Sequence, residues 1–282
     1  IIENADSLVM SLQSGAIDMF AHLTSTQVAQ LGDDFQVLEG TMNLVQALYL
    51  NNNVEPFNNE QVRQALCYAI DVDEIMELTA EGHGTKVGTS IYPAFTKYYD
   101  ESLNDAYPYD TEKAKELLTQ AGYPDGFSMT ITVPSNYTPH MNVAEVIVEQ
   151  LSRVGITATI NPVEWETWLS ETYMGRDFES TVVGFDASNL SAGALLNRWV
   201  STDGNNMINY NNPEYDSLMA QAAATTDDAQ QTDLYKQALL SETAANVYIQ
   251  DLPDFVLLKS NLEGYQFYPL YVMDLSTVHY VQ

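Results

Sequence analysis

The stretch from residue 129 to residue 163 constrains the fold of this chain more than any other part of the sequence. Met129–Val133 is predicted as a short strand, Met141–Arg153 as an amphipathic helix that Gly155 ends, and Ile156–Val163 as an alternating strand. If the two strands are parallel, the helix between them makes a right-handed crossover. Ligands in open α/β sheets bind beyond the carboxyl ends of strands. This rule directs attention to the segments that follow predicted strands, which are Pro134–His140, Val163–Trp168 and Gly184–Asn189.

The same alternation of amphipathic helices and short β-rich runs continues along the chain, which indicates an α/β protein with mixed sheets. Asn4 is expected to help cap the first helix, and Asn59 caps the most clearly amphipathic one. Near the C-terminus we predict one long helix over Ala229–Val247, followed by strands at Phe255–Lys259 and Gln266–Phe267. No internal repeat is visible.

The charge is strongly one-sided, with 39 Asp and Glu against 10 Lys and Arg and a net charge of -29. Such a surface repels phosphate backbones and anionic lipid headgroups, so nucleic acid is excluded as a partner. The acidity is read as solubility in an exposed compartment. The single cysteine, Cys67, lies in an apolar helical run, which predicts a buried, inert thiol and no disulfide framework. The apolar runs are shorter than a membrane span requires.

Catalytic and metal-binding motifs are missing from the sequence. The four histidines, His22, His83, His140 and His279, lie far apart and have neither the spacing nor the cysteine neighbours of a metal site. There is no nucleophile elbow, no Ser-x-x-Lys motif and no phosphate-binding loop. We therefore expect no enzyme activity, no cofactor and no bound metal.

Residues 51–71, NNNVEPFNNEQVRQALCYAID, resemble the signature segment of the family 5 extracellular solute-binding proteins. These are the oligopeptide-, dipeptide- and nickel-binding components of ABC importers. The resemblance continues in the family's order over nearly the whole chain. The signature itself is expected to build the fold and to contact no ligand. The further similar blocks are LQSGAID at 12–18, YDTEKAKELL at 109–118, AGYPDG at 121–126, VGI at 154–156, Glu164-Trp165 and NNPEYD at 211–216.

The resemblance implies a type II periplasmic-binding-protein fold, in which two lobes close on a ligand. It implies that residues 1–44 end the first lobe, that 45–252 form the second lobe, and that 253–282 return to the first. Because the chain opens Ile1-Ile2-Glu3 without Met, we interpret it as an excised piece. An early part of the first lobe and an inserted domain would then be absent.

Seven residues are candidate ligand contacts. The family places a tryptophan at Trp165 against the ligand, whereas Trp168 is expected in the core. Peptide-binding relatives carry Gly-Trp and an Asp that holds the peptide ammonium; here Phe185 and Ser188 occupy those positions, and Asp186 is the nearest acid. The loop with Asn136, Tyr137 and His140 aligns with a ligand-contacting loop, although helix capping by Thr138 explains it equally well. The nearest basic residue is Arg176, so carboxylate capture by this lobe is not expected.

These features predict the extracytoplasmic, substrate-binding part of an ABC importer, a monomer that delivers peptides to a membrane permease. Any membrane attachment would be a lipid anchor outside this chain. Two alternatives stay open. In the first alternative, the ligand is an oligosaccharide or a metal chelate, because Trp, Asn and Asp side chains also bind sugars. In the second, the fold is reused as an adhesion or sensory module that transports nothing.

Overall fold

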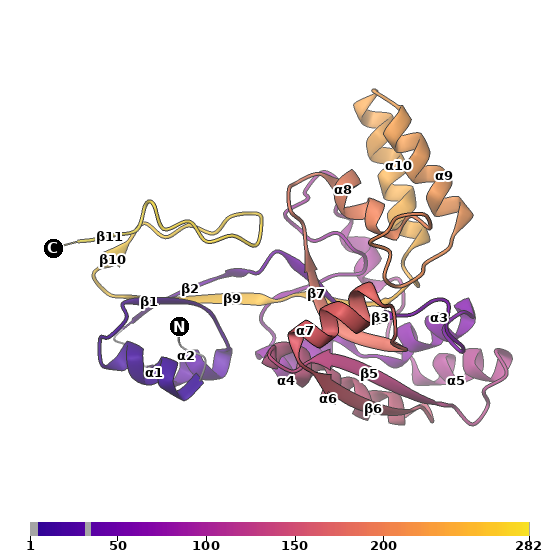
Figure 1. Cartoon of the computed structure of the whole chain (residues 1–282), viewed down its shortest axis with the longest axis horizontal. Helices are drawn as coiled ribbons and strands as arrows, with labels where there is room; N and C mark the ends of the chain where they lie inside the picture. Colours follow the sequence, from indigo (N-terminus) through magenta and orange to yellow (C-terminus); the bar gives the residue numbers. More distant parts are fainter. Residues whose placement is uncertain (1–4, 32–34, 282) are drawn as a thin grey trace.

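The computed structural model describes residues 5–31 and 35–281, which form two lobes (Figure 1). We call the part built on a six-stranded sheet, residues 44–251, the large lobe. The small lobe, residues 5–41 and 253–281, is built on a three-stranded sheet. The chain changes sheet at Leu44 and again at Pro253, beside the expected boundaries. The wider assignment of these parts to domains of a longer protein stays a prediction.

The large sheet is mixed, as the sequence predicted, with strand order β4-β8-β3-β7-β5-β6. β5 is parallel to both β6 and β7, which confirms the crossover unit, while the other pairs are antiparallel. The strands are β3 (Leu44–Leu50), β4 (Thr85–Lys86), β5 (Ser128–Pro134), β6 (Thr157–Val163), β7 (Ser180–Asp186) and β8 (Val247–Asp251).

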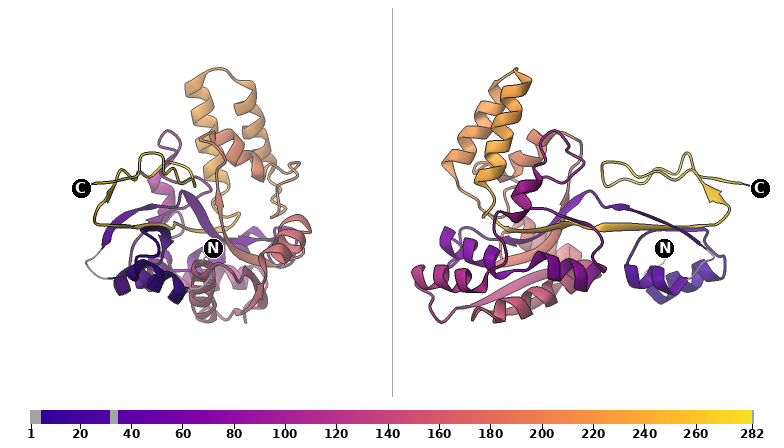
Figure 2. Two further views of the ribbon diagram at one scale, coloured as in Figure 1. Left: turned by 60° about the vertical axis from the view of Figure 1, so that its left-hand side comes forward. Right: turned by 180° about the vertical axis from the view of Figure 1, so that it is seen from behind.

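Helices cover both faces of this sheet. Because side chains alternate along a strand, Leu48 and Leu50 of β3 pack into one core with α3, α5 and α6, and Val45 and Tyr49 pack into the other with α8, α9 and α10. The α9–α10 pair projects from the lobe in both views of Figure 2. The helices are α3 (Glu60–Ala69), α4 (Val72–Ala80), α5 (Thr111–Gln120), α6 (Thr138–Ser152), α7 (Trp165–Thr167), α8 (Ala192–Leu196), α9 (Pro213–Ala224) and α10 (Asp228–Ser241), with short turns η2 (Glu101–Asp105), η3 (Trp168–Met174) and η4 (Asn197–Trp199).

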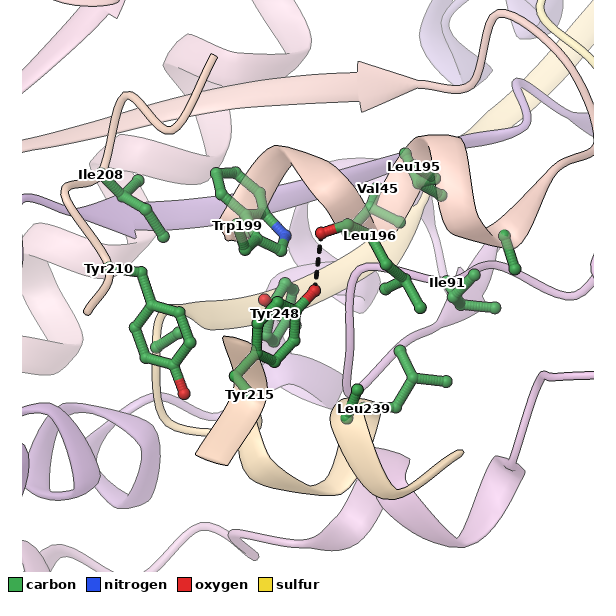
Figure 3. Packing of buried hydrophobic residues seen from close by; sticks show 14 of the residues in the cluster. Val45, Ile91, Leu195, Leu196, Trp199, Ile208, Tyr210, Tyr215, Leu239 and Tyr248 are labelled. Carbon is green, nitrogen blue, oxygen red and sulfur yellow. Dashed lines mark hydrogen bonds between the residues drawn. The ribbon is translucent and has the colours of Figure 1, made fainter. Parts of the chain in front are cut away.

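The core that packs against α8, α9 and α10 is rich in tyrosine and lies beside a buried acid, Glu242. Figure 3 shows Tyr215 donating to the carbonyl oxygen of Leu196, at 2.7 Å. Glu242, fully buried, accepts hydrogen bonds from the backbone N–H and the hydroxyl of Ser90. Burial raises the pKa of this carboxyl to about 7. Ionisation of such a buried carboxyl therefore lowers the stability of the folded state.

The small lobe is a sheet of order β1-β9-β2, all antiparallel. One face packs on the first two helices, and the other packs on side chains of the C-terminal segment, among them Tyr265, Phe267 and Val278. A two-stranded ribbon, β10 with β11, follows β9. The bounds are α1 (Ala5–Gln13), β1 (Met19–Leu23), α2 (Ser25–Leu31), β2 (Phe35–Thr41), β9 (Pro253–Lys259), β10 (Leu262–Glu263) and β11 (His279–Tyr280).

Two neighbouring connections join the lobes. The backbone N–H of Met42 donates to the carbonyl of Leu252 at 2.8 Å, so the outgoing and returning chains are hydrogen-bonded to each other. Asp251, also buried, accepts from the backbone N–H of Leu44 at 3.1 Å. The two connections between the lobes therefore lie side by side.

Two predictions near the C-terminus are wrong. The helix expected over Ala229–Val247 ends at Ser241, and 247–251 form the buried strand β8. Its sequence, VYIQD, is β-branched and aromatic, and pairing with β3 overrides the helical run before it. Gln266–Phe267 is not a strand; Leu262–Glu263 pairs with 279–280 instead. The expected cap at Asn4 lies outside the described residues.

The signature segment builds the large lobe. Asn59 caps α3 by accepting from the backbone N–H of Gln61. Arg63 donates to the carbonyl oxygens of Ala244 and Phe57, so its charge is satisfied by backbone dipoles. Cys67 is buried, as predicted, and burial raises its thiol pKa to about 12.

Candidate functional site

A cavity of about 490 Å³ lies between the two lobes. The large lobe contributes the segments that follow β5 and β6 and the carboxyl end of β7, which are the strand ends that the sequence rule selected. The small lobe contributes the opposite wall. The lining residues are His22, Thr24, Gln27, Met42, Leu44, Asn136, Tyr137, Thr138, Pro139, His140, Trp165, Val183, Gly184, Asp186, Leu252 and Tyr271. We call this cavity the cleft.

Trp165 lies in the cleft as the first residue of α7, which only Glu164 separates from β6. Its indole stacks on Trp168, with ring centroids 5.1 Å apart and planes 6° from parallel. Tyr137 meets it edge-on at 5.3 Å. Trp168 is 1% exposed and donates from Nε1 to Thr181, which confirms its expected place in the core. A buried indole thus supports a half-buried one that faces the cavity.

The segment 136–140, which leads into the first turn of α6, also lies in the cleft. The side chain of Asn136 accepts from the backbone N–H of Trp165 at 3.1 Å, and Tyr137 is exposed. His140 is 7% exposed, and its Nδ1 lies 2.8 Å from the amide nitrogen of Gln46. Burial lowers the His140 pKa to about 4, so this ring is neutral at pH 7. No side chain caps α6 at its N-cap Tyr137, and Thr138 is the first helical residue.

The strand end at 184–188 divides its side chains between two places. Gly184 and the exposed Asp186 line the cleft, whereas Phe185 points to the other face of β7, as alternation requires. Its ring lies 5.0 Å from Tyr49 and 4.3 Å from the guanidinium of Arg198. Ser188 is exposed beside a separate small cavity. Of the seven predicted residues, Phe185 and Ser188 are therefore not brought into the cleft.

Sequence reasoning missed the small-lobe wall. His22, Thr24 and Gln27 come from β1 and the start of α2, and Tyr271 comes from the C-terminal segment. The predicted strand ends pointed only to the large lobe. Pairing of β1 with β9, across more than 230 residues, brings this wall to the cleft, and no short motif records it.

The cleft is lined by an acid and by no strong base. Among the described residues its lining contains Asp186 and no Lys or Arg. Arg176, the nearest basic residue by sequence, donates to the side chain of Asn209 and to the carbonyl of Gly204 instead. Among the described residues no three His, Cys, Asp or Glu side chains gather as metal ligands. No helix in the described part of the chain is long and apolar enough to cross a bilayer.

Known proteins are similar to this chain in sequence and in fold. The chain is 32% identical over 279 residues to heme-binding protein A of Haemophilus influenzae, covering 94% of this chain and 50% of that protein. It is 34% identical over 202 residues to the glutathione-binding protein GsiB of Shigella flexneri, covering 67% of this chain and 39% of that protein. The chain thus spans half or less of these relatives. They are binding proteins rather than enzymes.

Among solved structures, the periplasmic binding protein DppA of Helicobacter pylori, in complex with the peptide STSA, superposes with a TM-score of 0.86 at 27% identity. The match covers 99% of this chain and 56% of that chain. The solved structures that this chain resembles have the type II periplasmic-binding-protein fold, which confirms the predicted fold class. Residues 1–207 match the family described as bacterial extracellular solute-binding proteins, family 5 Middle. The chain belongs to the family 5 bacterial extracellular solute-binding proteins.

Proposed function

We propose that this chain binds a small solute in the cleft as the receptor of an ABC importer and catalyses no reaction. The observation that carries the proposal is the cleft itself, a cavity of about 490 Å³ with an aromatic stack on one wall and a second lobe on the other. Such sites hold a ligand by apolar contact and orient it with a few polar groups.

Closure of the lobes would enclose the solute. The two connections lie side by side, so a change of a few backbone angles near Met42 and Leu252 swings the small lobe without disturbing either large-lobe core. The closed form is then recognised by a membrane permease. We place the protein outside the cytoplasm, as a monomer.

Peptides are the solute class that we favour. Trp165 and Tyr137 offer faces to side chains, Asn136 and Gln27 offer amide groups to a backbone, and Asp186 suits an ammonium or another cation. The proposed contacts are Asn136, Tyr137, His140, Trp165 and Asp186. An oligosaccharide or a metal chelate is the second candidate, because the same aromatic faces stack on sugars and on flat macrocycles.

Native mass spectrometry of the protein as purified tests the proposal, followed by titration with Ser-Thr-Ser-Ala, glutathione and hemin. A ladder of peptide masses, or saturable binding of the peptide without turnover, supports the peptide receptor. Saturable binding of hemin or a sugar alone keeps the transport role and rejects peptides. Hydrolysis of the bound peptide, or a cleft that stays empty with every probe, contradicts the proposal and favours an enzyme or an adhesion module respectively.

A further inference from the structure

His22 is held in an unusual backbone conformation at the wall of the cleft. Its φ is 61°, in the left-handed region that few residues other than glycine adopt. The pairing of β1 with β9 loses register between Phe20 and Leu23, so His22 lies in a bulge. Bulges re-aim a side chain, and backbone outliers that the surrounding structure enforces gather at functional sites. Here the bulge turns the imidazole towards the cleft.

A buried carboxylate fixes this conformation twice. Oδ1 of Asp254 accepts from the backbone N–H of His22 at 3.1 Å and lies 3.0 Å from its Nδ1. Asp254 belongs to the central strand β9 and is 5% exposed, so it cannot follow a moving ring. Tyr271 stacks on the His22 ring, with the two ring centroids 5.0 Å apart. Backbone, ring edge and ring face are therefore all constrained.

The same contact selects one tautomer. An ionised carboxylate only accepts hydrogen bonds, so Nδ1 must carry the proton that it shares with Asp254. In a neutral ring, Nε2 is then left with a lone pair. Within the described part of the chain no group bonds to Nε2, and the side chain is 35% exposed at the cavity wall. The small lobe thus offers the cleft one oriented acceptor.

We propose that Nε2 of His22 accepts a hydrogen bond from the bound solute and so selects ligands that bring an N–H or O–H donor to the small-lobe wall. In the part of the chain that the structure describes, no Lys or Arg lines the cleft to compete for this lone pair. A metal ion would need further ligands, and the described residues supply no group of three. The inference rests on the proposed function, because it assigns a contact within the same cleft.

Nitrogen NMR of the imidazoles tests the tautomer without any ligand. We expect the neutral form of the His22 ring to carry its proton on Nδ1 and none on Nε2. Addition of Ser-Thr-Ser-Ala or glutathione, whichever binds, should move the Nε2 resonance and leave Nδ1 protonated. A ring protonated on Nε2, or an Nε2 resonance that stays still while the probe binds, overturns the inference.

His22→Asn tests the contact energetically. Asparagine tolerates positive φ, so the bulge is kept while the acceptor no longer reaches the cleft. Loss of one hydrogen bond predicts affinity about tenfold weaker, with the melting temperature unchanged. His83→Asn is the matched control, since it removes another histidine–carboxylate pair, with Glu39, away from the cleft lining. Equal affinity of His22→Asn and wild type sinks the inference; absence of binding by wild type sinks the proposed function instead, while the tautomer is still measured.

Discussion

In the large lobe every residue of β3 and β8 is buried, whereas no residue of β2 in the small lobe is. The large sheet has helices on both faces and two extensive cores. The small sheet has a few apolar residues on each side, and its central strand β9 is joined to β8 through Leu252. The difference indicates a stable platform that carries one wall of the cleft, and a second wall that depends on that platform for its own central strand.

The largest expected effect is a cavity in the platform. Leu48→Ala, at a position that is 0% exposed in β3, should lower the free energy of unfolding by about 3 kcal/mol, because the site is packed between helices and cannot collapse. Urea-induced unfolding measures the loss. A loss below about 1 kcal/mol would break the comparison, since it would mean that the central strand is no better packed than the small sheet.

The next effect is electrostatic and also belongs to the large lobe. The folded-state pKa of Glu242 is raised from 4.5 to about 7, so the folded state binds the proton more tightly than the unfolded one. Stability contributed by this group is therefore present at low pH and is lost as pH rises from about 4.5 to about 7. The pKa of Asp251 is also raised to about 7, so this carboxyl likewise loses its contribution to stability as pH rises. The pKa of His140 is lowered to about 4, so its contribution is lost instead as pH falls below the ordinary histidine pKa.

Glu242→Gln removes that ionisation. It should stabilise the protein by about 2 kcal/mol at pH 8 and by nearly nothing at about pH 4, where the wild-type carboxyl is mostly neutral in both the folded and the unfolded state. Denaturant unfolding at both pH values measures the difference. An equal effect at the two pH values would assign the change to packing rather than to charge.

The third effect concerns the cleft between the lobes. Trp165→Ala removes the aromatic face that Trp168 supports, and we expect about tenfold weaker solute binding with little change in stability. Trp165→Phe, which keeps an aromatic ring, should recover part of the affinity. Titration calorimetry with Ser-Thr-Ser-Ala checks both variants. Unchanged affinity of Trp165→Ala would show that the stack of Trp165 on Trp168 does not contribute to solute binding.

The smallest effect is expected on the small sheet. Val37 of β2 is 44% exposed, so Val37→Ala should change the free energy of unfolding by less than about 0.5 kcal/mol. Hydrogen exchange sharpens the same point, because β2 amides should exchange before those of β3. Slower exchange in β2 than in β3 would reverse our ranking of the two lobes.

The sequence predicted those parts of the fold that local patterns encode. The crossover unit at 129–163 follows from periodicity and its Gly stop, and the cap at Asn59 follows from residue type. The strand at 247–251 was missed because the helix-favouring run before it continues without a break, and only pairing with β3 ends it. Trp165, Asp186 and the segment 136–140 were found because they lie at or just beyond the ends of strands. His22 and Tyr271 were not, because their places depend on contacts across the whole chain.

The paired indoles have an optical consequence. Trp165 and Trp168 lie 5.1 Å apart and nearly parallel, with one ring at the cleft surface and the other buried. Electronic transitions of chromophores this close couple, and the sign and strength of the resulting circular dichroism depend on the angle between them. A solute that tilts Trp165 by even a small angle would change that signal. The protein thus carries its own near-ultraviolet reporter of cleft occupancy, and no attached dye is needed to read it.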